Sequence, residues 1–107
     1  MKDATLGGYL RTHDRPPAFT GTDGASYSVD TLLIDDDPNL MPHVGGALLF
    51  VRWSADGAQP IGHLETDVIA VGANPEQVVE ALHALTLHDV KAHLDRLIET
   101  AAGEVDW

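Results

Sequence analysis

The segment ALLFVRW, residues 47–53, most constrains how this chain of 107 residues folds. Its side chains are apolar at both odd and even positions, with Leu49 and Val51 on one side and Leu48 and Phe50 on the other. Because successive side chains of a β-strand point to opposite faces of a sheet, such a strand needs cover on both faces. The segment therefore predicts a central strand with packing partners above and below the sheet.

Turn formers separate the other extended segments of the chain. The sequence TDG lies between PAFTG, a short edge strand, and residues 27–33, where apolar and polar side chains alternate. Asp56 and Gly57 mark the turn after the central segment, and residues 61–71 predict a fourth strand. We therefore expect an antiparallel sheet of three to four hairpin-linked strands.

Two amphipathic helices are predicted after the strands. Asn74 is a favourable N-cap with Pro75 at the first helical position, and Thr86 with Asp89 resembles a capping box. Two such helices can cover one face of a sheet. The expected fold is an α+β two-layer domain over residues 16–107, preceded by a loosely ordered N-terminal arm over residues 1–15, where LGG and HDRPP interrupt any periodicity.

The second face of the sheet then needs cover of its own. Candidates are the N-terminal arm and a second copy of the chain, because exposed apolar surface usually marks an interface. Two-fold dimers are the commonest oligomers. We predict a homodimer packed through its sheets, with an interface formed by Leu32, Ile34, Leu48 and Phe50 or by their neighbours of opposite parity.

Composition excludes several classes of function. The chain has no cysteine, which excludes disulfides, thiol nucleophiles and cysteine-type metal sites. Seventeen acidic residues against six basic ones give a net charge of −11, which opposes binding to nucleic acid or to an anionic membrane. No apolar run approaches the length of a membrane span, so we expect a cytoplasmic protein without a membrane partner.

The sequence GHLETD in the predicted fourth strand carries the sharpest candidate site. His63, Glu65 and Asp67 alternate, so a regular strand would project them from one face about 6–7 Å apart. An imidazole between carboxylates suits a general base or, with His43 as a further ligand beside His63 and Glu65, a metal site. Alternatively, the three form a solvated polar face whose carboxylates pair with Arg52.

Two further clusters invite a metal-site interpretation. His83, His88 and His93 lie within eleven residues, but helical geometry spreads His88 and His93 about 140° apart, which favours surface and boundary positions. The segment DDDPN matches only the first ligands of a calcium loop, and an acidic turn explains it better. No nucleophile or phosphate-binding motif is present, so no cofactor is predicted.

Residues 67–85, DVIAVGANPEQVVEALHAL, resemble the strand–turn–helix segment of HicB-type antitoxins. The resemblance covers less than a fifth of the chain and implies a small sheet-and-helix domain that neutralises a toxin. Three hypotheses follow. The first is a noncatalytic dimeric protein-interaction module. The alternatives are a small-molecule or metal-dependent enzyme that uses the fourth-strand stripe, and an antitoxin-like regulator.

Overall fold

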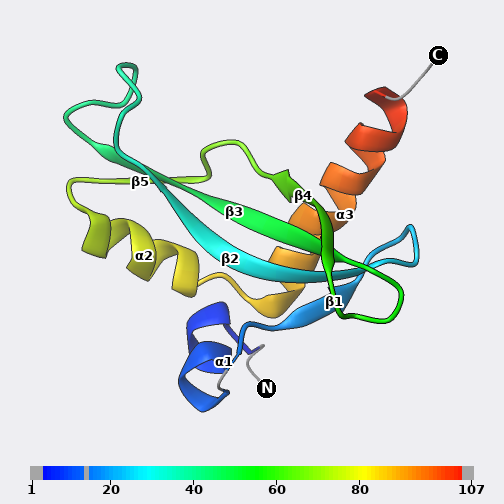
Figure 1. Cartoon of the computed structure of the whole chain (residues 1–107). Helices are drawn as coiled ribbons and strands as arrows, with labels where there is room; N and C mark the ends of the chain where they lie inside the picture. Colours follow the sequence, from blue (N-terminus) through cyan, green and yellow to red (C-terminus); the bar gives the residue numbers. More distant parts are fainter. Residues whose placement is uncertain (1–3, 14, 105–107) are drawn as a thin grey trace.

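The expected α+β architecture is confirmed. The computed structural model describes residues 4–13 and 15–104, and its described part holds an antiparallel five-stranded sheet and three helices (Figure 1). The helices α2 and α3 pack on the sheet. In chain order the elements are α1 (Leu6–Thr12), β1 (Ala18–Thr20), β2 (Ser26–Ile34), β3 (Val44–Trp53), β4 (Pro60–Glu65), β5 (Ala70–Gly72), α2 (Pro75–His83) and α3 (Leu87–Glu104).

Strand β3 is central, as its apolar sequence predicts. One of its edges pairs with β2 along the whole length of the shorter strand. Its other edge is shared, since β4 pairs with residues 49–53 and β5 with residues 44–46. The outer strand β1 is a short edge strand that pairs only with residues 26–28 of β2.

The predicted fourth strand is interrupted in its middle. Residues 66–69 leave the regular ladder between β4 and β5, while backbone bonds hold both ends of this interruption to β3. The Thr66 N–H donates to the Leu48 carbonyl at 3.0 Å, and the Ile69 N–H donates to the Gly46 carbonyl at 2.8 Å. The continuous strand expected over residues 61–71 is therefore two short strands on one edge.

The register of β2 and β3 decides which side chains face the helices. Phe50 lies opposite Val29, and both are buried among residues of α2 and α3. Gly46 has the same parity as Phe50, and a Cβ there would overlap Val78 of α2. The buried core consists of Leu6, Tyr27, Val29, Val44, Leu48, Phe50, Val78, Leu82, Val90, Leu94 and Ile98.

The predicted interface residues split between the two faces. Leu48 and Phe50 are completely buried on the helix-covered face, so their assignment to a subunit interface is wrong. Leu32 lies opposite Ala47 and Ile34 opposite Gly45, which places both on the other face. The prediction failed because the register pairs even-numbered residues of β2 with odd-numbered residues of β3, so residues of the same parity on the two strands point to opposite faces.

The N-terminal arm differs from the expected loose segment. Helix α1 begins after Thr5, whose hydroxyl accepts a hydrogen bond from the Gly8 N–H at 3.0 Å. Leu6 is 1% exposed and belongs to the core. A Cβ at Gly7 would lie 2.8 Å from the His83 Cβ, so this glycine lets α1 approach α2 closely. Gly7, which suggested disorder, permits helix packing instead. Met1–Asp3 lie outside the described residues.

Both predicted helix starts are confirmed. The Asn74 side chain accepts from the Gln77 N–H at 2.9 Å, with Pro75 at the first helical position. Thr86 and Asp89 bond reciprocally, since the Asp89 N–H donates to the Thr86 hydroxyl and the Thr86 N–H donates to the Asp89 carboxylate. In the part of the chain that the structure describes, no helix has the length and apolarity to cross a bilayer.

The close approach of α2 to β3 predicts that Gly46→Ala destabilises the fold. The added methyl would overlap Val78 and lie 3.0 Å from a Leu82 methyl group, so the helix must shift. We expect a loss of about 1–3 kcal/mol in the free energy of unfolding, measured by urea denaturation. Gly62→Ala is the matched control, because a Cβ there meets no atom within 4 Å. Equal stability of the two variants would contradict the packing.

Candidate functional site: the open face of the sheet

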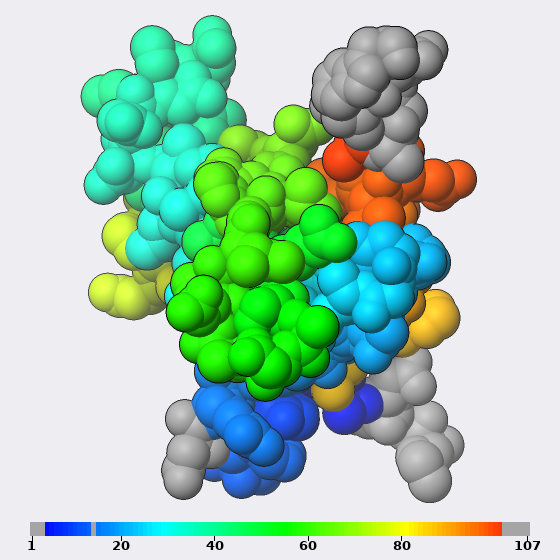
Figure 2. All heavy atoms as spheres, turned by 45° about the vertical axis from the view of Figure 1, so that its right-hand side comes forward, coloured from blue at the N-terminus to red at the C-terminus, as the bar shows by residue number. Residues whose placement is uncertain are grey.

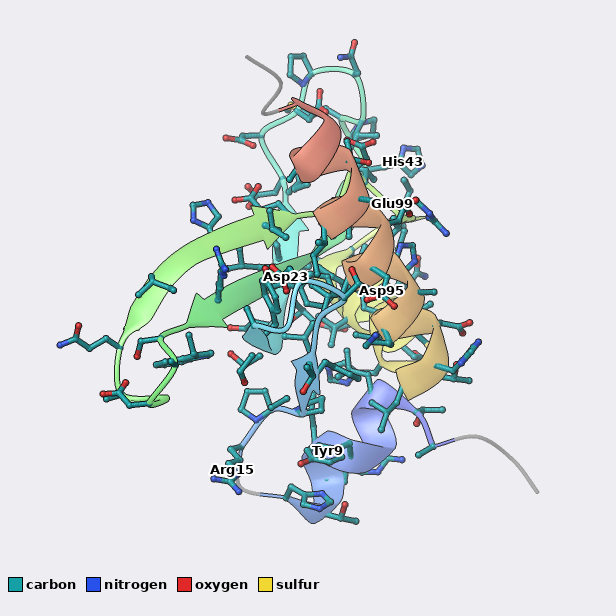
Figure 3. The ribbon with its side chains drawn as sticks, turned by 90° about the vertical axis from the view of Figure 1, so that its right-hand side faces the viewer. Tyr9, Arg15, Asp23, His43, Asp95 and Glu99 are labelled. Atoms are coloured by element: carbon teal, nitrogen blue, oxygen red, sulfur yellow. The ribbon has the colours of Figure 1, made fainter. Side chains whose placement is uncertain are left out.

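One face of the sheet is left largely open. Figure 3 shows the sheet and helices from the side, with α3 to one side of the strands and no helix of the described residues beyond their other side. The end of this face near Gly45 and Ala47 has cover. A Cβ at Gly45 would meet the Leu40 and Val68 side chains, and Ala47 is fully buried. We call the half-buried apolar side chains on this face the open-face strip: Leu32, Ile34, Leu49, Val51 and Trp53.

Trp53 is the largest side chain of the open-face strip. Its indole Nε1 donates to the Ser28 hydroxyl at 2.9 Å, which fixes the ring across the β2–β3 pair. Next to it, Ile61 is 56% exposed and lines a hollow together with Trp53. A fixed aromatic beside exposed aliphatic groups is the composition found at the centre of protein interfaces.

His63 and Glu65 also lie on the open face. They stand opposite Val51 and Leu49, and the His63 Nε2 is 3.6 Å from a Glu65 carboxylate oxygen. Their side chains are 65% and 49% exposed. Together with Leu49 and Val51 of the open-face strip they line a shallow depression of about 390 Å³. His63 and Glu65 thus share one face of the sheet, but no enclosed pocket of the described residues excludes water from them.

The other members of the predicted site do not join them as expected. Strand β4 ends at Glu65, so Asp67 follows the strand and lines a different cleft, beside α3. His43 is exposed in the loop before β3 (Figure 3). Among the described residues, no three histidine or carboxylate side chains are placed to hold a metal ion. His43, His63 and Glu65 therefore do not form a ligand set.

Arg52 takes a partner other than the predicted carboxylates. Its guanidinium is 3.9 Å from Asp23, in the turn between β1 and β2 (Figure 3), rather than near Glu65 or Asp67. The parity explains this, since Arg52 points to the helix-covered side while Glu65 lies opposite Leu49 on the open face. The predicted cross-strand pairing between β3 and β4 is therefore wrong.

Asp23 and Tyr27 form a polar link at the end of the helix-covered face. The Tyr27 hydroxyl donates to the Asp23 carboxylate at 2.7 Å. Burial, and then this bond to an anion, raise the pKa of Tyr27 to about 12. Burial acts to raise the pKa of Asp23 as well, but hydrogen bonds from Tyr27 and the Ala25 N–H outweigh it and lower that pKa. The sequence did not predict this link, although TDG marks the turn that holds Asp23, four residues before Tyr27.

The three clustered histidines stay apart, as the helical spacing predicts. His83 ends α2 beside α1, and His88 is exposed on α3. His93 is half-buried in the cleft that Asp67 lines. Burial and the nearby charge of Arg96 lower the pKa of His93, and together they outweigh the opposing attraction of Asp89. His93 is therefore uncharged at neutral pH.

Comparison of the chain with family models, with curated proteins and with solved structures gave no match. The resemblance to HicB-type antitoxins therefore depends on residues 67–85 alone. Those residues do form a strand, a turn and a capped helix, as β5 and α2. Any strand-to-helix connection shares these features, so function has to be argued from the surfaces of this molecule.

The Tyr27–Asp23 bond predicts a loss of stability at high pH. A pKa raised from 10.0 to about 12 means that folding favours the neutral phenol. The free energy of unfolding should therefore fall as pH rises from about 10 through about 12, by on the order of 2 kcal/mol from this group. Urea denaturation at pH 8 and above 11 should show a smaller fall in Tyr27→Phe. The same fall in both proteins would rule out this origin.

Thr66 predicts a second stability effect, at the interruption of the edge. Its hydroxyl accepts from the Leu48 N–H at 3.0 Å and donates to the Asp67 carbonyl at 2.8 Å. Thr66→Val leaves that N–H unpaired and should cost about 1–3 kcal/mol in thermal or urea unfolding. Thr31→Val is the control, because Thr31 is also half-buried and bonds Asp30 through its backbone N–H. A cost no larger than the control's would count against the role of the hydroxyl.

Proposed function

We propose that the protein is a noncatalytic interaction module that acts as a homodimer through the open face of its sheet. The supporting observation is the open-face strip, five apolar side chains that stay half-buried with no helix of the described residues over them. At the centre of the strip, Leu49 and Val51 on β3 lie opposite the polar residues Asp30 and Ser28 on the neighbouring strand β2. An apolar strip with a polar rim is the arrangement of a protein interface.

A second copy is the occupant that we favour. The N-terminal segment, the other candidate for this face, packs on α2 through Gly7 and supplies Leu6 to the core below the sheet. A two-fold contact places the same surface on both subunits, so the strip of one copy would meet the strip of the other. The acidic side chains Asp30 and Glu65 would then lie beside the apolar contact instead of at its centre.

Net charge gives the proposed dimer a characteristic salt dependence. Each copy carries a net charge of −11, so two copies repel one another over a distance of about 10 Å at moderate salt. Added salt screens this repulsion and strengthens apolar contact. A dimer held by the open-face strip should therefore become tighter between 50 mM and about 300 mM sodium chloride, whereas one held by ion pairs should weaken.

The enzyme alternative receives less support from the geometry. His63 and Glu65 are both largely exposed in a shallow depression, and Asp67 and His43 lie elsewhere. A general base at an open surface lacks the water-excluded environment that makes such a group effective. A noncatalytic role for this face is the simpler proposal.

The test is sedimentation equilibrium of the wild-type chain and two matched variants. Val51→Lys places a charge in the middle of the open-face strip and should weaken dimerisation at least tenfold. Val79→Lys is the control, since Val79 is also half-buried but lies on α2 in the helix layer. A wild-type monomer at 100 μM, or equal effects of the two variants, would overturn the proposal.

A further inference from the structure

A separate cleft lies between the segment after β4 and the outer half of α3. Its volume is about 440 Å³. In Figure 2 the yellow-green atoms of this segment stand next to the orange surface of α3. Two sections of the chain form its walls, residues 64–69 on one side and one flank of α3 on the other. The lining residues are Leu64, Glu65, Thr66, Asp67, Ile69, His93, Arg96, Leu97, Thr100 and Ala101.

The cleft exists because α3 is longer than the layer it covers. Val90, Leu94 and Ile98 recur every four residues and turn one stripe of the helix into the core. Leu97 and Ala101 occupy the adjacent flank and stay only half-buried. Figure 1 shows the last turns of α3 extending past the strands. Apolar groups on this flank are therefore left without a strand to cover them.

The opposite wall is shaped by the interruption of the sheet edge. Residues 66–69 bend out of the ladder, and the Thr66 hydroxyl fixes the bend by bonding both the Leu48 N–H and the Asp67 carbonyl. Leu64 and Ile69, on either side of the bend, pack against the core and remain half-buried. Together with Leu97 they give the cleft an apolar floor.

The two walls carry opposite charges. Arg96 projects from α3, while Asp67 belongs to the opposite wall; the Glu65 carboxylate lies on the open face beside His63. Among the described cations, Lys91 bonds Asp95 and Arg52 lies near Asp23, whereas Arg11, Arg15 and Arg96 form no ion pair with a described carboxylate. Arg96 has no ion-pair partner among the described carboxylates. A guanidinium without a partner in so acidic a chain is available to a ligand's carboxylate.

We propose that this cleft binds a small zwitterion with an apolar side chain, of the class of free aliphatic amino acids. The ligand's carboxylate would meet Arg96, and its ammonium group would meet Asp67. Its side chain would cover the apolar floor. A simple organic anion would instead meet the Asp67 carboxylate in a chain of net charge −11, and a simple cation would meet Arg96.

The neighbouring polar groups fit this ligand class. His93 is uncharged at neutral pH, so it adds a hydrogen-bonding group to the Arg96 wall without a second positive charge. Thr100, on the same wall, donates its hydroxyl to the Arg96 carbonyl at 2.9 Å and can accept a bond from the ligand's ammonium group. Binding in this cleft does not require the proposed dimer, because Leu64 has the parity of Phe50 and faces the helix layer, away from the open-face strip.

The experiment titrates three ligands of matched shape into the ¹⁵N-labelled full chain. L-Leucine carries both charges, L-leucinamide lacks the carboxylate and 4-methylpentanoate lacks the ammonium group. We expect saturable amide shifts for leucine at Thr66, Asp67, Leu97 and Ala101. The other two ligands should bind at least tenfold more weakly. Absence of saturable shifts with leucine, or equal binding of leucinamide, would overturn the proposal.

Variants then assign the two charged walls. Arg96→Gln should weaken leucine binding at least tenfold and leave leucinamide binding unchanged, and Asp67→Asn should weaken both of these ligands. Arg52→Gln is the control, because it removes an arginine outside the cleft whose partner is Asp23. Sedimentation of Arg96→Gln should match that of the wild type, which separates this inference from the dimer. Leucine binding as tight in Arg96→Gln as in the wild type would falsify the assignment of the carboxylate to Arg96.

Discussion

The rest of the structure depends on how the second edge of β3 is shared. A regular strand over residues 61–71 would have occupied this edge without a gap. Instead, β4 pairs with one part of β3, residues 66–69 bend away, and β5 pairs with another part of β3. The Thr66 hydroxyl takes the place of a backbone carbonyl for the Leu48 N–H, so the bend leaves no buried donor unpaired there. The second pairing holds β5 beside Gly46, and helix α2 starts directly after β5.

Those features that depend on local chemistry could be predicted from the sequence. Asn74 and Thr86 cap their helices through bonds within three residues, and such bonds need no knowledge of the rest of the fold. The central place of β3 could also be predicted, because a segment that is apolar at both parities needs cover on both faces. The order of strands followed from the turn formers between them.

Features that depend on distant contacts could not be predicted. The stripe of His63, Glu65 and Asp67 assumed strand geometry through residue 67, but Thr66 ends the regular alternation by bonding a different strand. Arg52 and Glu65 are neighbours in the sheet yet point to opposite faces. The cleft between residues 64–69 and α3 brings Asp67 together with Arg96. Their proximity depends on where α3 crosses the sheet.

The two proposed surfaces contribute less than the core to the stability of the fold. Core residues such as Phe50 have no accessible surface, whereas Val51 and Leu97 stay half-buried without strain on the fold. Substitutions at half-buried sites of this kind change binding more than stability, because much of their apolar area is already in water. Both surfaces can therefore be altered one at a time in a chain that still folds.

Backbone hydrogen bonds join the first described residues to the connection between α2 and α3. The Leu6 N–H donates to the Leu85 carbonyl, and the Leu87 N–H donates to the Ala4 carbonyl, each at 2.8 Å. The hairpins of the sheet form between neighbours in sequence, but these bonds join positions near opposite ends of the chain and cost more conformational entropy. A nascent chain cannot complete its core until the segment after α2 has been made, however early Leu6 is synthesised.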